Sequence, residues 1–230
     1  MTNKTNRTAE RRNDLTELVF ILDKSGSMSG MEADTVGGFN SMIKKQKKEE
    51  GSALVSAVLF NQESEVLLDR VSLDRVRELT TDDYTPMGCT ALLDAVGDAV
   101  KHIANIHKYA RPEDVPSKTV FVITTVGMEN SSRKFTYEKL KKLIQKEQEK
   151  YGWEFIFLGA NIDAAATASS IGIRKERASN YTNDSMGASV MYEAVSDAVS
   201  SFRSCQPLSA SCNAKVEKDS ERSGFFRRKR

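Results

Sequence analysis

No stretch of this sequence approaches the roughly 18 consecutive apolar residues that a membrane-spanning helix needs. Residues 1–12 are polar throughout and lack the apolar core of a secretory signal. Cysteine is scarce: the chain has three in 230 residues, an odd number and a poor basis for a disulfide framework. We therefore expect a cytosolic (cytoplasmic) protein without a membrane span and with reduced thiols, and a Cys205–Cys212 bridge is the alternative in an oxidising setting.

A charge excess of one sign is also missing, because 34 basic residues face 32 acidic ones and leave a net charge of +2. Bulk attraction to nucleic acid is therefore not expected, and no specific nucleic-acid partner is predicted. His102 and His107 stand five apart on an expected helix, so they do not share a face as a zinc-binding pair would.

The basic residues concentrate at the two ends of the chain. Residues 1–14 form a basic N-terminal tail before the first apolar run. From residue 204 onward Ser, Lys, Arg and Glu dominate with almost no apolar periodicity, which predicts a disordered basic tail over 204–230. One domain is expected between the tails, over residues 15–203.

Between the tails, short apolar runs alternate with longer helical patterns, which is typical of a mainly parallel sheet covered by helices. Four runs suit strands that are buried on both faces: 18–22, 53–60, 119–124 and 153–158. Residues 65–68 follow a short turn and predict an antiparallel edge strand. The sequence thus predicts an α/β fold: a doubly wound, mostly parallel central sheet with helices on both faces, Rossmann-like, with one antiparallel edge strand.

The helical patterns and the apolar runs also predict a core. Helices are expected over roughly 31–49, 91–109, 136–150 and 185–202, and a weak last strand near 177–181. The expected core includes two positions from each of the four strands: Val19, Ile21, Leu54, Val58, Val120, Val122, Phe155 and Phe157.

Three loops lie at one edge of the predicted sheet, each of them after a strand or before a helix: 23–30, 85–90 and 125–132. In an open parallel sheet the carboxyl ends of the strands face a common crevice where ligands bind. There the sequence places one carboxylate and three hydroxyls: Asp23, Ser25, Ser27 and Thr90. Such hard oxygen ligands are the set that Mg²⁺ or Mn²⁺ prefers. The alternative is that the serines only cap the helix that follows.

The segment Asp23-Lys-Ser-Gly-Ser27 after an apolar strand resembles the D-x-S-x-S motif of von Willebrand factor A-like domains. Residues 88–94, Gly-Cys-Thr-Ala-Leu-Leu-Asp, are similar to the second-loop signature of that family, whose threonine corresponds to Thr90. The resemblance covers roughly residues 15–203 and is to the stand-alone type of bacteria and phages. It implies a metal-ion-dependent adhesion site of Asp23, Ser25, Ser27 and Thr90, at which an acidic residue of a protein partner completes the coordination.

The third loop departs from the family pattern, because Thr125-Val126-Gly127 stands where the family commonly has Thr-Asp-Gly. A carboxylate about 5 Å from a divalent ion contributes roughly 6–7 kcal/mol before desolvation at an effective dielectric near 20. Its absence predicts weak metal binding. We expect the Val126 side chain to point into the crevice beside Asp23, and Glu129 is the candidate for compensation.

The resulting functional hypothesis is a metal-assisted protein-binding module that works in a protein assembly and is not an enzyme. One alternative is a structural scaffold whose metal site has decayed. Another is a phosphotransferase or phosphatase with Asp23 as nucleophile, but such enzymes carry a second aspartate as general acid where this chain has Ser25. The chain also lacks the glycine-rich loop of nucleotide-binding proteins.

Overall fold

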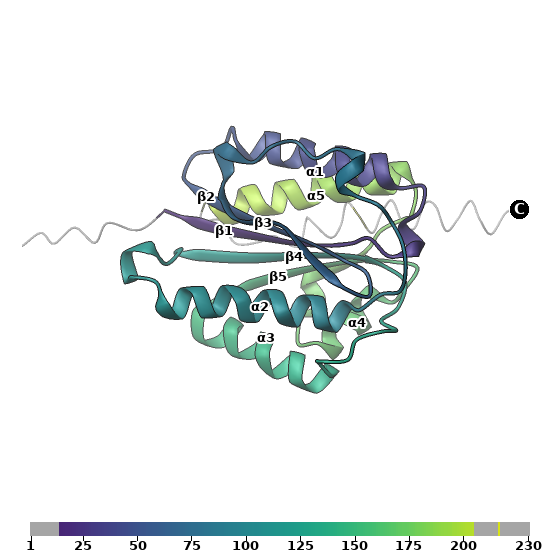
Figure 1. The fold of residues 1–230 in the computed structure, drawn as a ribbon. Helices are drawn as coiled ribbons and strands as arrows, with labels where there is room; N and C mark the ends of the chain where they lie inside the picture. Colours follow the sequence, from purple (N-terminus) through teal and green to yellow (C-terminus); the bar gives the residue numbers. More distant parts are fainter. Residues whose placement is uncertain (1–13, 205–215, 217–230) are drawn as a thin grey trace, which may run out of the picture.

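The computed structural model describes residues 14–204 and residue 216 of the chain (Figure 1). The two expected tails, 1–14 and 204–230, lie almost entirely outside these described residues. Val216 is the exception: it is only 1% exposed and belongs to an apolar cluster of the domain.

A six-stranded sheet with the order β3-β2-β1-β4-β5-β6 forms the centre of the domain. Its strands are β1 (Thr16–Asp23), β2 (Ala53–Phe60), β3 (Ser64–Ser72), β4 (Lys118–Val126), β5 (Glu154–Ala160) and β6 (Ala178–Asn180). All neighbouring strands are parallel except β2 and β3, which form an antiparallel pair at one edge. The predicted α/β fold with one antiparallel edge strand is confirmed.

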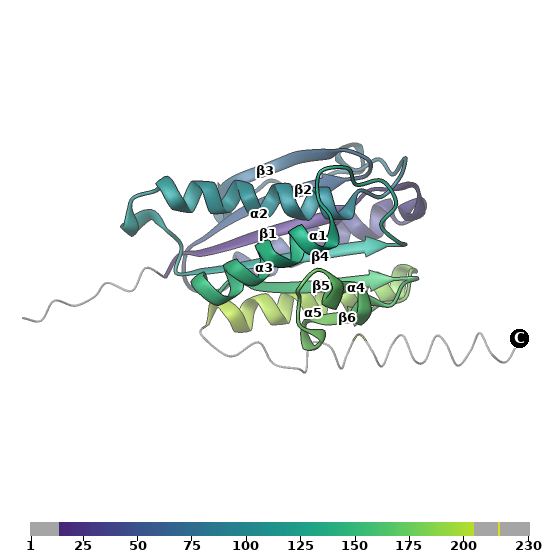
Figure 2. The same ribbon diagram turned by 90° about the horizontal axis from the view of Figure 1, so that it is seen from below.

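Helices cover both faces of the sheet, as predicted (Figures 1 and 2). On one face lie α1 (Glu32–Gln46) and α5 (Ser185–Arg203). On the other face lie α2 (Leu92–Tyr109), α3 (Tyr137–Tyr151) and α4 (Ala164–Ser170). Five single-turn 3-10 helices complete the described elements: η1 (Gly26–Met28), η2 (Leu73–Arg75), η3 (Thr81–Asp83), η4 (Pro112–Asp114) and η5 (Lys175–Arg177).

The two apolar layers follow from the alternation of side chains along each strand. In β1, Phe20 and Leu22 face α1 and α5, whereas Val19 and Ile21 face α2 and α3. Each expected core position is buried except Leu54, which is half-buried. Leu54 lies one strand from the sheet edge, on the face that α2 covers, and this helix shields that flank only partly.

The end of α5 is fixed to the end of α1 by a buried arginine. Arg203 is 8% exposed, and its guanidinium donates to the backbone oxygens of Gln46 (2.6 Å), Glu50 (3.1 Å) and Gly51 (2.8 Å). It also donates to the Gln46 side-chain oxygen at 3.1 Å. Carbonyls at the end of a helix lack partners within the helix, so this side chain satisfies the Gln46 carbonyl at the end of α1 and ties α5 to the segment that follows α1.

No helix among the described residues is both long and apolar enough to cross a membrane. The parallel strands β1, β4 and β5 end on the same side of the molecule, which is most readily seen from below (Figure 2). This edge therefore carries the loops that the sequence analysis singled out.

Candidate metal-binding site

Asp23, the last residue of β1, is the buried centre of the candidate site. The residue is 1% exposed. One carboxylate oxygen accepts a hydrogen bond from the Ser25 amide (2.7 Å). The other accepts from the Thr125 hydroxyl (2.7 Å) and the Val126 amide (3.1 Å). The carboxylate therefore joins the first loop to the end of β4.

The two serines of the first loop lie together beside it. Their hydroxyl oxygens are 2.9 Å apart, and the Ser27 hydroxyl donates to the Val126 carbonyl at 2.6 Å. Because the Ser27 proton is used in that bond, Ser25 is the donor to Ser27. Lone pairs of both oxygens remain for a further ligand, and Ser27 is exposed to solvent while Ser25 is buried.

The second loop lies against the first and the third. Its Gly88 carbonyl accepts from the Gly26 amide at 3.0 Å. Thr90 is buried, its amide donates to the Asn130 side chain (2.9 Å), and its carbonyl accepts from the Asn130 amide (3.0 Å). The three loops thus converge as predicted, with Asp23, Ser25 and Ser27 in mutual contact and Thr90 on the adjoining loop.

Val126 lies close to Asp23 and Ser27, but through its backbone. The expectation that its side chain points into the crevice is wrong, because the side chain is 1% exposed and belongs to the apolar cluster under α1 and α5. Strand alternation explains this, since Val126 follows Val120 and Val122 on that face of β4.

Glu129 does not compensate for the missing third-loop carboxylate. Its oxygens accept from the amides of Leu93 (2.9 Å), Ser131 (2.9 Å) and Ser132 (2.7 Å), and from the Ser132 hydroxyl (2.8 Å). The side chain satisfies one amide in the first turn of α2, where a negative charge is also favoured by the helix dipole, and two amides of its own loop. Glu129 therefore organises the third loop rather than the metal site.

Tyr84 is a contact of the site that the sequence analysis missed. Its hydroxyl donates to the backbone carbonyl of Asp23, and the residue is 1% exposed. Burial raises the pKa of Tyr84 far above its usual range, so the hydroxyl remains a donor. An isolated tyrosine in a mixed segment gives no sequence signal for this role.

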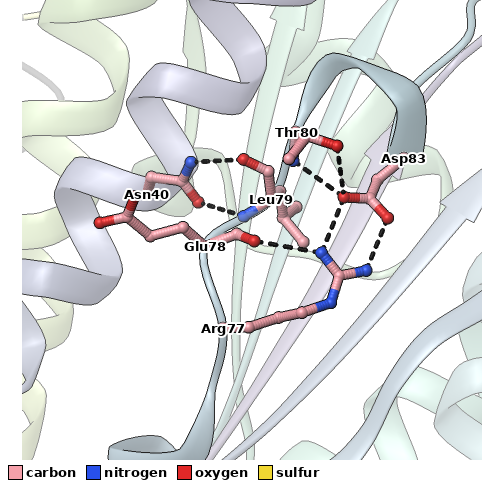
Figure 3. A network of polar contacts seen from close by, with 6 residues as sticks. All are labelled: Asn40, Arg77, Glu78, Leu79, Thr80 and Asp83. Carbon is pink, nitrogen blue, oxygen red and sulfur yellow. Dashed lines mark hydrogen bonds and ion pairs between the residues drawn. The ribbon is translucent and has the colours of Figure 1, made fainter.

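The segment that carries Tyr84 is held by a polar network (Figure 3). The Asn40 side chain of α1 bonds both backbone groups of Leu79, each at 2.8 Å. Arg77 then makes a two-pronged ion pair with Asp83 at 2.8 and 2.6 Å. Asp83 also accepts from the Thr80 amide at 2.8 Å. These contacts hold the segment that leads from β3 to Tyr84 against α1.

Two exposed methionines lie on the loops that carry the site. Met87 on the second loop is 57% exposed, and Met128 on the third loop is 76% exposed. Methionine side chains adapt to differently shaped partners. Neither methionine was predicted from the sequence as part of the site.

The oxygen donors of the site fit a hard divalent cation, but only one carboxylate offsets the charge of that ion. Asp23 supplies a carboxylate and the two serines supply hydroxyl oxygens with free lone pairs, which are ligands of the kind that Mg²⁺ and Mn²⁺ take. Among the residues that the structure describes, no group of three or more His, Cys, Asp or Glu could hold a metal. Asp23 is thus the carboxylate on which such a site depends.

Comparison with known proteins finds structures of similar fold but no match by sequence. No protein-family profile matches the chain, and no curated protein matches its sequence. The solved structure of proximal thread matrix protein 1 from the mussel byssus is similar, with 18% identity, a TM-score of 0.59, and coverage of 81% of this chain and 46% of that one. The same mussel protein with a zinc-occupied MIDAS motif is similar at 19% identity and a TM-score of 0.57, over 80% of this chain and 46% of that one.

A bacterial domain shows the same likeness. The vWF domain of the type V pili tip protein Mfa5 from Porphyromonas gingivalis is 12% identical, with a TM-score of 0.55, over 80% of this chain and 94% of that one. The present chain spans less than half of the mussel protein but nearly all of the Mfa5 domain. At these identities the likeness concerns the fold, and the chain has the fold of a von Willebrand factor A domain.

Proposed function

We propose that this domain is a metal-assisted protein-binding module. The observation that carries the proposal is the gathering of the Asp23, Ser25 and Ser27 oxygens at the open end of β1. In the proposed site these residues and Thr90 hold Mg²⁺ or Mn²⁺, and the ion attracts an acidic residue of the partner. The similar mussel protein whose MIDAS motif holds zinc supports metal binding by this fold.

Exposed apolar side chains on the loops of the site support a protein as the partner. Met87 on the second loop and Met128 on the third loop offer apolar contact area. The resemblance to stand-alone bacterial and phage domains favours a bacterial cytoplasm as the setting. We propose no catalytic role, because Asp23 is buried with both oxygens hydrogen-bonded, and Ser25 cannot act as the general acid of a phosphotransferase.

A scaffold with a decayed metal site is the second candidate, and a specific observation favours it. Both oxygens of Asp23 are already bonded to protein donors, and the Ser25 and Ser27 hydroxyls are bonded to each other. The site is thus internally satisfied without a cation. Metal titration separates this candidate from the proposed module.

Because the Val126 side chain lies in the apolar cluster under α1 and α5, Val126→Asp is expected to direct its carboxylate away from the ion and to leave Mg²⁺ and Mn²⁺ affinity within about twofold of the wild type. The wild type is expected to bind Mg²⁺ only in the millimolar range, because a single carboxylate offsets the dehydration of the ion. Without metal the variant is expected to be less stable, since the new carboxylate enters an apolar cluster beside Asp23. Calorimetric titration and thermal melts with and without Mg²⁺ measure both effects.

Val126→Asn is the matched control for the loss of stability, because it has the same shape without the charge, and it is likewise expected to leave Mg²⁺ affinity within about twofold of the wild type. Micromolar Mg²⁺ binding by the wild type would show that the single-carboxylate account is wrong. If the wild type binds no Mg²⁺ or Mn²⁺, the proposed metal-assisted module is wrong and the scaffold with a decayed metal site is favoured. A partner captured by the wild type should be lost with chelator and with Ser27→Ala.

A further inference from the structure

The peptide unit between Asp23 and Lys24 joins β1 to the first loop, and hydrogen bonds hold it at both ends. Its amide, that of Lys24, donates to the Phe60 carbonyl at the end of β2 (2.7 Å). Its carbonyl, that of Asp23, accepts from the Tyr84 hydroxyl. Because a peptide unit is planar, these two contacts fix the direction in which the chain enters the loop that carries the two serines.

Tyr84 reaches this carbonyl from a segment that is itself held in place. The residue is 1% exposed and lies in the apolar cluster under α1 and α5. Its neighbour Asp83 accepts from Arg77 at 2.8 and 2.6 Å and from the Thr80 amide at 2.8 Å (Figure 3). A tyrosine side chain turns about only two torsion angles, so a hydroxyl on this fixed backbone makes a precise contact.

Two further tyrosines lie in the same apolar cluster and allow a direct comparison with Tyr84. Tyr181, which follows β6, and Tyr192, in α5, are each 5% exposed. Burial raises the pKa of all three hydroxyls above the usual range of tyrosine, so each hydroxyl stays protonated. Of these three described residues, Tyr84 is the one whose hydroxyl is bonded to a residue of the proposed metal site.

The contact matters for the metal ligands because their mutual positions depend on the start of the loop. The Asp23 carboxylate accepts from the Ser25 amide at 2.7 Å, and the Ser25 hydroxyl lies 2.9 Å from that of Ser27. A rotation of the peptide unit after Asp23 would move both serines away from the carboxylate. Loss of a group that holds a metal ligand in place typically weakens metal binding by roughly 10–100-fold.

We propose that Tyr84 is a positioning residue of the metal site: its hydroxyl holds the Asp23 carbonyl and thereby keeps the ligand oxygens of the first loop gathered for a divalent cation. This role in metal binding rests on the proposed function. The hold of Tyr84 on the loop does not depend on a metal, so amide exchange without metal and Mn²⁺ binding test the two parts separately.

Tyr84→Phe removes the hydroxyl and keeps the ring, and Tyr192→Phe is the matched control. In the metal-free full chain, Tyr84→Phe is expected to speed hydrogen exchange of the Lys24 and Ser25 amides roughly tenfold relative to the amides of β4. The reason is that the loop opens more easily when the Asp23 carbonyl loses its donor. Tyr192→Phe is expected to leave this ratio within about twofold of the wild type. Nuclear magnetic resonance measures exchange at each amide, and melting curves show that both variants fold.

The same two variants are then titrated with Mn²⁺, and electron paramagnetic resonance measures the free ion. Tyr84→Phe is expected to weaken Mn²⁺ binding about tenfold, whereas Tyr192→Phe is expected to leave the affinity within about twofold of the wild type. A hydroxyl that served stability alone would lower the melting temperature and leave Mn²⁺ affinity unchanged.

An exchange ratio in Tyr84→Phe that equals that of the wild type would overturn the proposal. Mn²⁺ affinities that are unchanged in Tyr84→Phe, or lowered equally in the two variants, would overturn it as well. A wild type that binds no Mn²⁺ would refute the proposed metal-binding module and with it the role of Tyr84 in metal binding. The exchange ratio still shows in that case whether Tyr84 holds the first loop, so the two failures are distinguishable.

Discussion

Replacing Arg203 with methionine is expected to lower the free energy of unfolding by about 3–5 kcal/mol, because hydrogen bonds to charged groups contribute roughly 1.5–3 kcal/mol each and their effects are not additive. The substitution keeps the apolar stem and removes the guanidinium. The carbonyls of Gln46, Glu50 and Gly51 then lose a buried donor. Chemical denaturation of both proteins measures the difference.

Arg111→Met is the matched control for that experiment. The Arg111 side chain is 75% exposed and pairs with Asp114 at the surface, so its replacement is expected to change stability by less than about 1 kcal/mol. If Arg203→Met lowers the free energy of unfolding as little as Arg111→Met does, the attachment of α5 does not depend on its last residue. A loss of stability in Arg203→Met but not in Arg111→Met would show that the buried guanidinium of Arg203 holds α5 to the end of α1.

Asp23→Ala is expected to destabilise the protein by about 3 kcal/mol in the absence of metal, since each buried donor left unsatisfied costs about 1–3 kcal/mol. The donors that lose their acceptor are the Ser25 and Val126 amides and the Thr125 hydroxyl. The same variant is expected to lose Mg²⁺ binding entirely. Denaturation in chelator measures the first effect and calorimetric titration the second.

Ser27→Ala separates the contribution of the site to stability from its contribution to metal binding. Ser27 is exposed and donates to the Val126 carbonyl, so its loss is expected to cost about 1 kcal/mol or less of stability. It should nevertheless weaken metal binding, because it removes one oxygen ligand. A large loss of stability in Ser27→Ala, or none in Asp23→Ala, would contradict the hydrogen-bond assignment.

Most of the fold could be predicted from the sequence because the strands carry an unambiguous pattern. The runs at 18–22 and 119–124 are apolar at nearly every position, which is expected only of strands covered on both faces. Leu54 was predicted as core for the same reason. Periodicity identifies which residues form a strand, but it does not show how far a helix extends over each flank.

The convergence of the three loops could also be predicted, because it follows from the parallel order of β1 and β4. The orientation of Val126 could not, since a loop residue of the family pattern is here the last residue of a strand with its side chain under α1 and α5. The contact of Tyr84 with Asp23 joins residues 61 positions apart through an irregular segment. No periodic signal marks such a contact.

The central position of β1 has a consequence for the order of events during synthesis. β1 is made first, but its partner β4 begins about a hundred residues later, at Lys118 against Thr16. Until β4 is made, β2 and its hairpin partner β3 can cover only one edge of the apolar strand β1, and the other edge of β1 stays unpaired. Long-range parallel pairing of this kind forms slowly, and unpaired strand edges favour aggregation. The nascent chain thus has its greatest need of chaperone protection before β4 leaves the ribosome.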